Sequence, residues 1–149
     1  MIYFATDHRG FELKEKLKKF VESELGFDSN DFGAFEYNVE DDYPDFISKA
    51  AEAVSKNPDH DKAIILGGSG QGEAIVANRY PGIRAIVYYG GANDIITLSR
   101  EHNNANVLSL GAAFLDEVEA KKAVRIWLEH PFSHAERHVR RIKKIDSKN

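Results

Sequence analysis

The stretch that decides the fold is Ala63-Ile64-Ile65-Leu66-Gly67-Gly68-Ser69-Gly70-Gln71-Gly72-Glu73. Its first four residues are all apolar, which predicts a short buried strand. Four glycines then occur within six residues and let the backbone approach a ligand closely before a helix begins at about Glu73. The first N–H groups of a helix lack partners within it, so this loop predicts a pocket for an anion or an oxyanion.

Similar strand and helix patterns flank this stretch on both sides. Apolar runs predict strands at 2–5, 63–66, 83–89 and 106–110, with one further short strand within 27–42. Helical spacing predicts helices at 10–25, 43–56, 73–79, 93–101, 115–129 and 134–146. In the fifth helix we expect Leu115, Val118, Ala123 and Trp127 to face inward. The alternation predicts an α/β fold, a three-layer αβα Rossmann-like sandwich with a five-stranded parallel sheet and an additional C-terminal helix.

Length and composition narrow the class of protein. The 149 residues, 42% hydrophobic and 30% charged, fit one domain over 1–149 with a real core. The absence of cysteine excludes a disulfide framework, thiolate zinc sites and a cysteine nucleophile. A net charge of −4 gives no general attraction for nucleic acid. We see no signal peptide and no membrane-spanning run, so we expect a cytoplasmic protein that binds no membrane.

The glycine loop and Glu73 allow two interpretations each. The loop matches neither a Walker motif nor G-x-G-x-x-G in register, and the simpler interpretation is a tight turn without a ligand. For Glu73 the simpler interpretation is a first-turn acid that the helix dipole favours. The functional interpretation is a general base beside an oxyanion pocket, with the hydroxyl of Ser69 as a further donor. Removing a proton from a carbon next to a carbonyl needs both a base and hydrogen-bond donors for the oxygen that becomes negative.

Other polar residues occur at the ends of predicted elements. Asp7 and His8 follow the first strand and are either a helix cap or a pair that transfers protons or binds hydroxyl groups. His102 and Asn103 end the fourth helix and are either turn-forming residues or site residues. Near the C-terminus, a basic stripe contains Arg137, Arg140, Arg141 and Lys144. It is either a solvated face or, through Arg137 and Arg141 four residues apart, a clamp for one phosphate.

Taken together, these motifs resemble the ribose-5-phosphate isomerase B family and its relatives, the galactose-6-phosphate isomerase subunits. The resemblance covers nearly the whole chain. It depends on Asp7-His8-x-Gly10, Asp42-Tyr43-Pro44, Gly67 to Glu73, Ala77 to Ala85, and Ser99-Arg100-Glu101-His102-Asn103-x-x-Asn106-Val107-Leu108.

The resemblance implies an aldose–ketose isomerase, an intramolecular oxidoreductase of the pentose phosphate pathway that uses neither metal nor cofactor. The reaction that we expect from the resemblance is the interconversion of ribose 5-phosphate and ribulose 5-phosphate. It also implies a homodimer, often a dimer of dimers, with sites shared between subunits. In one branch of the family the base is a cysteine at the position of Gly67; this sequence resembles the branch that uses a glutamate at Glu73.

The same resemblance implies roles for individual residues. Asp7 and His102 would assist ring opening, and Ser69 with the loop N–H groups would stabilise the enediolate. His102 and Asn103 would come from the neighbouring subunit. The substrate-binding residues that it implies are His8, Tyr43, Gly68, Gly70, Gly72, Asn103, Arg137 and Arg141.

Two positions depart from the family pattern. Many members carry an arginine where this chain has Ala113, and a small residue where it has Arg9. We hypothesise that Arg9 replaces the missing charge in the phosphate pocket. Three alternatives remain open: an isomerase of another sugar, such as allose 6-phosphate, galactose 6-phosphate or an unphosphorylated sugar; a non-catalytic sugar-phosphate-binding paralogue; and, least favoured by the glycine spacing, a nucleotide-binding domain.

Overall fold

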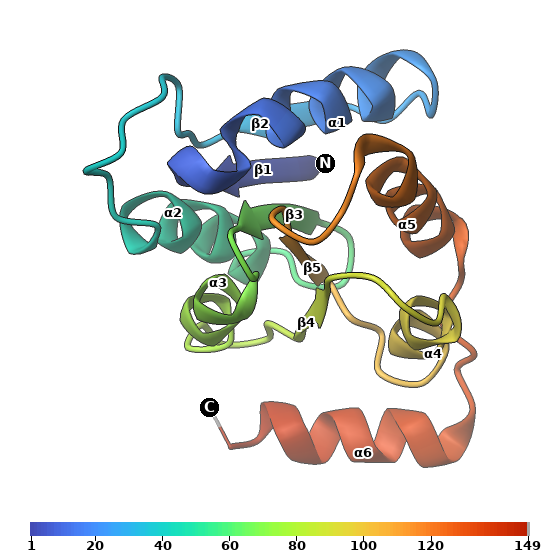
Figure 1. Ribbon diagram of the computed structural model, residues 1–149. Coiled ribbons are helices and arrows are strands. Elements are labelled where there is room, and N and C mark those ends of the chain that lie inside the picture. Colours follow the sequence, from blue (N-terminus) through green and yellow to red (C-terminus); the bar gives the residue numbers. More distant parts are fainter. Residues whose placement is uncertain (149) are drawn as a thin grey trace.

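A computed structural model describes residues 1–148 and shows one parallel sheet of five strands in the order β2-β1-β3-β5-β4 (Figure 1). The strands are β1 (Ile2–Thr6), β2 (Ser29–Asp31), β3 (Lys62–Gly67), β4 (Ala85–Tyr88) and β5 (Val107–Gly111). The helices are α1 (Phe11–Ser23), α2 (Pro44–Ser55), α3 (Gln71–Ala77), α4 (Asp94–Glu101), α5 (Glu117–Glu129) and α6 (Glu136–Asp146). A short 3-10 turn, η1 (His8–Gly10), connects β1 to α1.

Helices cover both faces of the sheet, as the alternating pattern predicts (Figure 1). Side chains alternate between faces along a strand, so β3 contributes to two separate cores. Ile64 and Leu66 pack with residues of α1, α4 and α5, whereas Ala63 and Ile65 pack with residues of α2 and α3. The predicted three-layer αβα sandwich is therefore confirmed, and the central strand β3 is buried on both sides.

Two details of the helices differ from the sequence-based expectation. Helix α3 begins at Gln71, two residues before the predicted start, so Glu73 lies within its first turn. In α5, Val118 is 76% exposed, and the prediction that it faces inward is wrong. The reason is helical geometry, because Val118 lies nine residues before Trp127 and so on the opposite side of the helix. A capping box of Asp116 and Glu119 starts the helix two residues later than predicted. Its buried residues are Ala120, Ala123, Val124 and Trp127.

Helix α6 lies apart from the three layers, beyond the β4 edge of the sheet (Figure 1). Only His138 of this helix is buried. Near its end, Asp146 accepts from the guanidinium of Arg84 at 3.3 Å. Helix α6 is thus an appendage with one face toward the domain. Across residues 1–148, none of the helices has the length and apolar character that a membrane crossing requires.

Candidate active site

The carboxylate of Glu73 lies over Gly67, at the carboxyl end of the central strand. A Cβ atom placed on Gly67 would collide with that carboxylate, so only glycine leaves room for it. Gly70 caps α3 with φ +76°, a conformation that glycine adopts without strain, and it turns the chain back over the strand end. Glu73 is 4% exposed although it is ionisable. A buried carboxyl group at this point can exchange a proton with a ligand rather than with bulk water.

The surroundings of Glu73 favour its protonated form. Burial raises the pKa of Glu73, the hydrogen bond from its own backbone N–H lowers it, and the nearby charge of Asp7 raises it. The balance is a pKa above the ordinary value for glutamate. This direction agrees with the expectation for a base that also has to return a proton, and Asp7 adds a cause that the sequence pattern did not reveal.

Asp7 reaches Glu73 because of the strand register. Thr6 pairs with Leu66, so the residues that follow β1 and β3 emerge side by side. Asp7 is 7% exposed, and its Oδ1 accepts from the backbone N–H of Arg9 at 2.9 Å. It therefore caps η1, the simpler of its two interpretations, and at the same time presents a carboxylate beside Glu73.

Two further side chains border the glycine turn. A Cβ on Gly72 would lie 2.6 Å from Oη of Tyr43, and a Cβ on Gly68 would lie 3.5 Å from Nε of Arg9. The N–H of Ala113 donates to the carbonyl of the same Gly68 at 3.0 Å. Arg9 thus extends along the turn beside Gly68, the same glycine whose carbonyl accepts from Ala113.

Ser69 lies at the outer side of the turn and is exposed. Its Oγ accepts from the N–H of Gln71 at 3.3 Å, which leaves its hydroxyl hydrogen available to a ligand. Ser69 and Gln71 line a cavity of about 120 Å³ with Tyr89 and Phe114. Those two rings pack edge to face at 5.9 Å and are 54% and 63% exposed. The turn therefore adjoins an uncovered apolar surface.

His8 is held by Asp41, a residue that the sequence analysis did not identify. Nδ1 of His8 lies 2.6 Å from Oδ1 of Asp41, and the backbone N–H of His8 donates to the same oxygen at 3.1 Å. Asp7, His8 and Asp41 place one ligand atom each within 4.8 Å of one another. A separation of 2.6 Å is the length of a hydrogen bond, and it is shorter than the spacing of two ligands around a tetrahedral zinc with bond lengths of about 2.0–2.2 Å. In the sequence, the one feature that could have pointed to Asp41 is its position directly before the motif Asp42-Tyr43-Pro44.

The remaining predicted site residues form a second group. His102 and Asn103 follow α4 and precede β5, whereas Gly67 pairs with Gly111 at the far end of β5. The four steps from Val107 to Gly111 separate the two ends of β5 by about 13 Å, at about 3.3 Å per residue. Within one chain, the structure therefore does not bring His102 and Asn103 to Glu73.

His102 instead meets helix α6. Its ring stacks on that of His138 with centroids 4.3 Å apart and planes 15° apart, and Nε of Arg137 donates to Nε2 of His138 at 3.3 Å. Burial lowers the pKa of His138, and the charges of His102, Arg137 and Arg141 lower it further. The second group is thus a cationic cluster, and His138 belongs to it although the sequence analysis passed over it. The sequence feature that could have identified His138 is its position between Arg137 and Arg141 on the predicted C-terminal helix.

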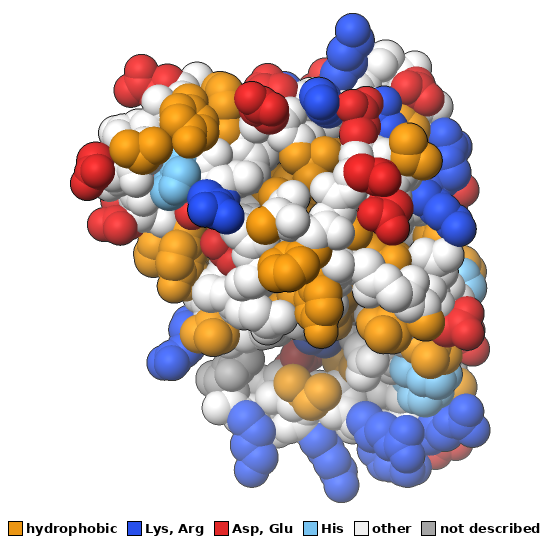
Figure 2. All heavy atoms as spheres, viewed as in Figure 1, with side chains coloured by type: hydrophobic (Ala, Val, Ile, Leu, Met, Phe, Trp, Pro, Cys, Tyr) orange, Lys and Arg blue, Asp and Glu red, His pale blue; other side chains and the backbone are white. Residues whose placement is uncertain are grey.

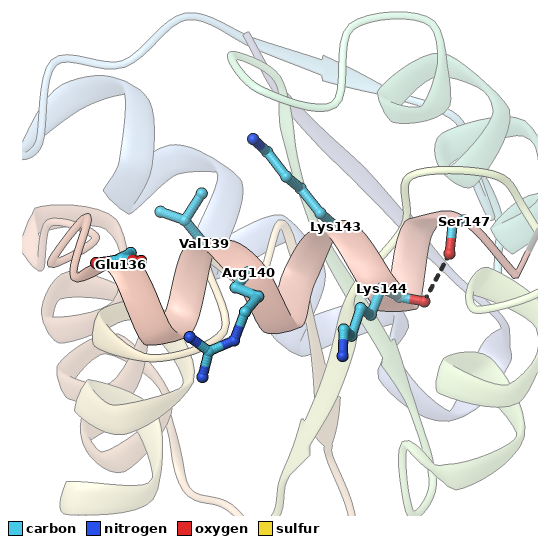
Figure 3. A pocket seen from close by; sticks show the side chains of 6 residues that line it. All are labelled: Glu136, Val139, Arg140, Lys143, Lys144 and Ser147. Carbon is cyan, nitrogen blue, oxygen red and sulfur yellow. Dashed lines mark hydrogen bonds between the residues drawn. The ribbon is translucent and has the colours of Figure 1, made fainter.

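A larger cavity of about 410 Å³ follows the outer side of α6 (Figure 3). Lys and Arg side chains gather there, along the α6 side of the face shown in Figure 2. Figure 3 shows Arg140 and Lys144 extending from one side of the helix and Lys143 from another. Its lining residues are Glu136, Val139, Arg140, Lys143, Lys144 and Ser147. Neither a buried acid nor a glycine turn borders it, so it is not the candidate active site.

Fold and site together define a doubly wound α/β domain whose central strand ends in a glycine turn beneath a buried carboxylate. The family model described as Ribose/Galactose Isomerase matches residues 2–145, and the chain belongs to this family. The ribose-5-phosphate isomerase B of Mycolicibacterium paratuberculosis is 40% identical over 141 residues, which is 95% of this chain and 86% of that protein.

Solved structures give the same result. The ribose-5-phosphate isomerase B of Mycoplasma genitalium, crystallised with bound ribulose 5-phosphate, is 35% identical with a TM-score of 0.93, over 99% of this chain and 94% of that one. The enzyme of Thermotoga maritima is 40% identical with a TM-score of 0.88, over 98% and 97% of the two chains. The family expected from the sequence motifs is confirmed.

Proposed function

We propose that the chain, as a single domain over residues 1–149, is an aldose–ketose isomerase that interconverts ribose 5-phosphate and ribulose 5-phosphate. The observation that carries the proposal is the buried carboxylate of Glu73 above Gly67, at the end of the central strand. The names of its relatives, and the ribulose 5-phosphate bound to one of them, support this choice of substrate. Its lack of cysteine fits a cytoplasmic enzyme.

The proposed reaction passes through a 1,2-enediolate. Asp7 and His102 move protons so that the furanose ring opens. Glu73 then removes the proton from C2, and the negative charge that develops on O1 meets the N–H groups of Gly68, Gly70 and Gly72 and the hydroxyl of Ser69. Glu73 returns the proton to C1, and transfer of the hydroxyl proton from O2 to O1 completes the ketose. Every step uses side chains and backbone of this chain, with no metal or cofactor.

Substrate binding is divided between the two groups of residues. Tyr43 and Asn103 contact the sugar hydroxyls, and the phosphate lies among His8, Arg9, Arg137 and Arg141. Arginine suits this task because its forked donors match phosphate oxygens. The placement of Arg9 along Gly68 supports its inclusion in the phosphate pocket.

We further propose that each site is shared between two copies of the chain, in a homodimer or a dimer of dimers. In one chain the two groups lie at opposite ends of the strands, which supports a site in which a second copy brings its His102 to Glu73. Exposed apolar side chains support such an interface, namely Tyr89 and Phe114 beside Ser69, Ile75 on α3, and Ile95 and Leu98 on α4. Isologous contacts of a twofold dimer would bury this surface on both copies.

A coupled assay with the purified chain alone tests the proposed activity. We expect turnover of ribose 5-phosphate to ribulose 5-phosphate, and slower turnover of allose 6-phosphate, galactose 6-phosphate and the free sugars. Preference for one of these other sugars would reassign the substrate. Binding of ribose 5-phosphate without turnover would identify a non-catalytic paralogue.

Mixing two inactive variants tests the shared site. Glu73→Gln and His102→Ala each damage every site of their own homodimer. A mixed dimer keeps one intact site, so refolding an equal mixture should restore activity to about a quarter of the wild-type level in a statistical assembly. Activity that stays at the sum of the two separate variants would place Glu73 and His102 of one chain in the same site.

A further inference from the structure

The feature that the proposed mechanism leaves unused is the carboxylate of Asp41. Its Oδ1 accepts two hydrogen bonds from one residue, from the backbone N–H of His8 at 3.1 Å and from the His8 ring at Nδ1, 2.6 Å away. Two contacts to one oxygen fix both the backbone and the ring plane of His8. The ring of Tyr37 also meets that of His8 edge to face at 6.0 Å, so the imidazole is confined from a second direction.

Asp41 has no other strong partner. Its side chain is 8% exposed, and its Oδ2 is buried without a hydrogen-bond partner within residues 1–148. In the same part of the chain its one ion pair is with His8. Asp31 provides a contrast, because Lys14 and Lys18 both contact its carboxylate, at 2.7 and 3.0 Å. A buried carboxylate is costly unless it is paired, so the interaction of Asp41 is directed at His8 alone.

This contact determines which nitrogen of His8 meets a ligand. A carboxylate accepts hydrogen bonds only, so Nδ1 has to carry a hydrogen. Nε2 is then the nitrogen available to the substrate, and it has no hydrogen-bond partner within residues 1–148. When the ring is doubly protonated, Nε2 donates to an anion while Asp41 balances the charge from the other side.

We propose that Asp41 is a positioning residue that orients His8 so that Nε2 donates to the substrate phosphate. The proposal rests on the proposed function, in which His8 binds that phosphate. Asp41 acts through His8 and does not touch the substrate itself. Its role is the one that second-sphere carboxylates play for histidines elsewhere, namely to set ring orientation and tautomer.

Steady-state kinetics with ribose 5-phosphate form the first test. Asp41→Ala should raise KM about tenfold and change kcat less than about twofold, because a lost charge-assisted hydrogen bond weakens binding by about that factor. Asp41→Glu should recover part of this loss. The matched control is Glu40→Gln, which removes the neighbouring exposed charge and should leave KM unchanged. An unchanged KM in Asp41→Ala, or an equal rise in Glu40→Gln, would overturn the proposal.

Nitrogen-15 NMR of the free protein forms the second test and needs no catalytic activity. Where the His8 ring is neutral, the wild type should show the hydrogen on Nδ1, and Asp41→Ala should shift it toward Nε2. The signal is assigned by its loss in His8→Gln. Hydrogen on Nε2 in the wild type would refute the orientation by Asp41. If Asp41→Ala does not fold, the isosteric Asp41→Asn serves instead, since an amide can donate to Nδ1 and no longer fixes the tautomer.

The two tests separate this inference from the proposed function. Hydrogen on Nδ1 together with no isomerase activity would retain the positioning role and reject the substrate. Isomerase activity together with hydrogen on Nε2 would retain the proposed substrate and reject the positioning role of Asp41.

Discussion

The two groups of site residues differ in how the fold holds them. Glu73 and Asp7 are 4% and 7% exposed and lie at the ends of adjacent central strands, where the register leaves little freedom. Arg137 and Arg141 are exposed, on a helix that lies apart from the sheet. The difference shows that the proposed base Glu73 and its neighbour Asp7 are fixed by the centre of the sheet. The two arginines proposed to bind the phosphate lie on a helix that the sheet does not cover.

Glu73→Gln should remove the function of the central group while its fold remains. We expect kcat to fall by at least about a hundredfold, the lower range for loss of a general base. KM and the circular dichroism spectrum should change little, because the amide fills the same space. Near-normal turnover in this folded variant would show that another residue is the base.

Gly67→Ala should disturb the same carboxylate by steric contact alone. The added Cβ would collide with the end of the Glu73 side chain, which is flexible enough to turn aside without unfolding the strand. We expect activity to fall by about ten- to a hundredfold, since misplacement of a reacting group by about 1 Å can cost that much. A thermal melt should remain close to that of the wild type. Unchanged activity would mean that the carboxylate acts from a different position.

Arg137→Ala should weaken binding at the second group. If Arg137 contacts the phosphate, KM for ribose 5-phosphate should rise about tenfold with a smaller change in kcat. The matched control is Arg140→Ala on the same helix, whose side chain lines the outer cavity (Figure 3). Equal effects of the two variants would indicate a general electrostatic contribution of α6 and no specific contact.

Arg9→Ala tests whether the central group also contributes to anion binding. Because Arg9 is exposed, we expect a smaller rise in KM, about threefold, with less effect on turnover. The free sugar supplies the comparison, since its turnover should not depend on Arg9. An unchanged KM for the phosphorylated sugar would dispose of the idea that Arg9 replaces a charge at position 113.

The smallest expected effect is on thermal stability, where Glu73→Gln should raise the melting temperature although it lowers activity. The raised pKa of Glu73 means that the folded state holds this proton more tightly than the unfolded state. Its contribution to stability is therefore present at low pH and is lost as pH rises through the raised value. Glu73→Gln should melt above the wild type at neutral pH, by about 2–4 °C for each kcal/mol of relieved burial. The difference should shrink below about pH 4, where the carboxyl is neutral in both states.

The sequence predicts the layered fold well because the signals are local. The apolar run at Ala63 to Leu66 and the glycines after it determine strand and turn without reference to the rest of the chain. Val118 shows where such reasoning stops. Its apolar character suggests burial, but it lies nine residues, or two and a half helical turns, before Trp127 and is therefore on the opposite side of the helix.

The site is less accessible to sequence reasoning because its contacts cross between distant elements. The proximity of Asp7 to Glu73 follows from strand register, and the contact of Asp41 with His8 spans 33 residues through an irregular segment. The stacking of His102 on His138 depends on the placement of α6. Periodicity carries no information on any of these.

The overlap between Gly67 and the carboxylate of Glu73 has an evolutionary consequence. A cysteine at position 67, as the family resemblance implies for one branch, would fill the volume that the Glu73 carboxylate occupies here. Because the glutamate side chain can turn aside, a chain with both residues would still fold. Substitutions at positions 67 and 73 are therefore coupled, since any side chain larger than glycine at position 67 displaces the carboxylate from the end of the central strand.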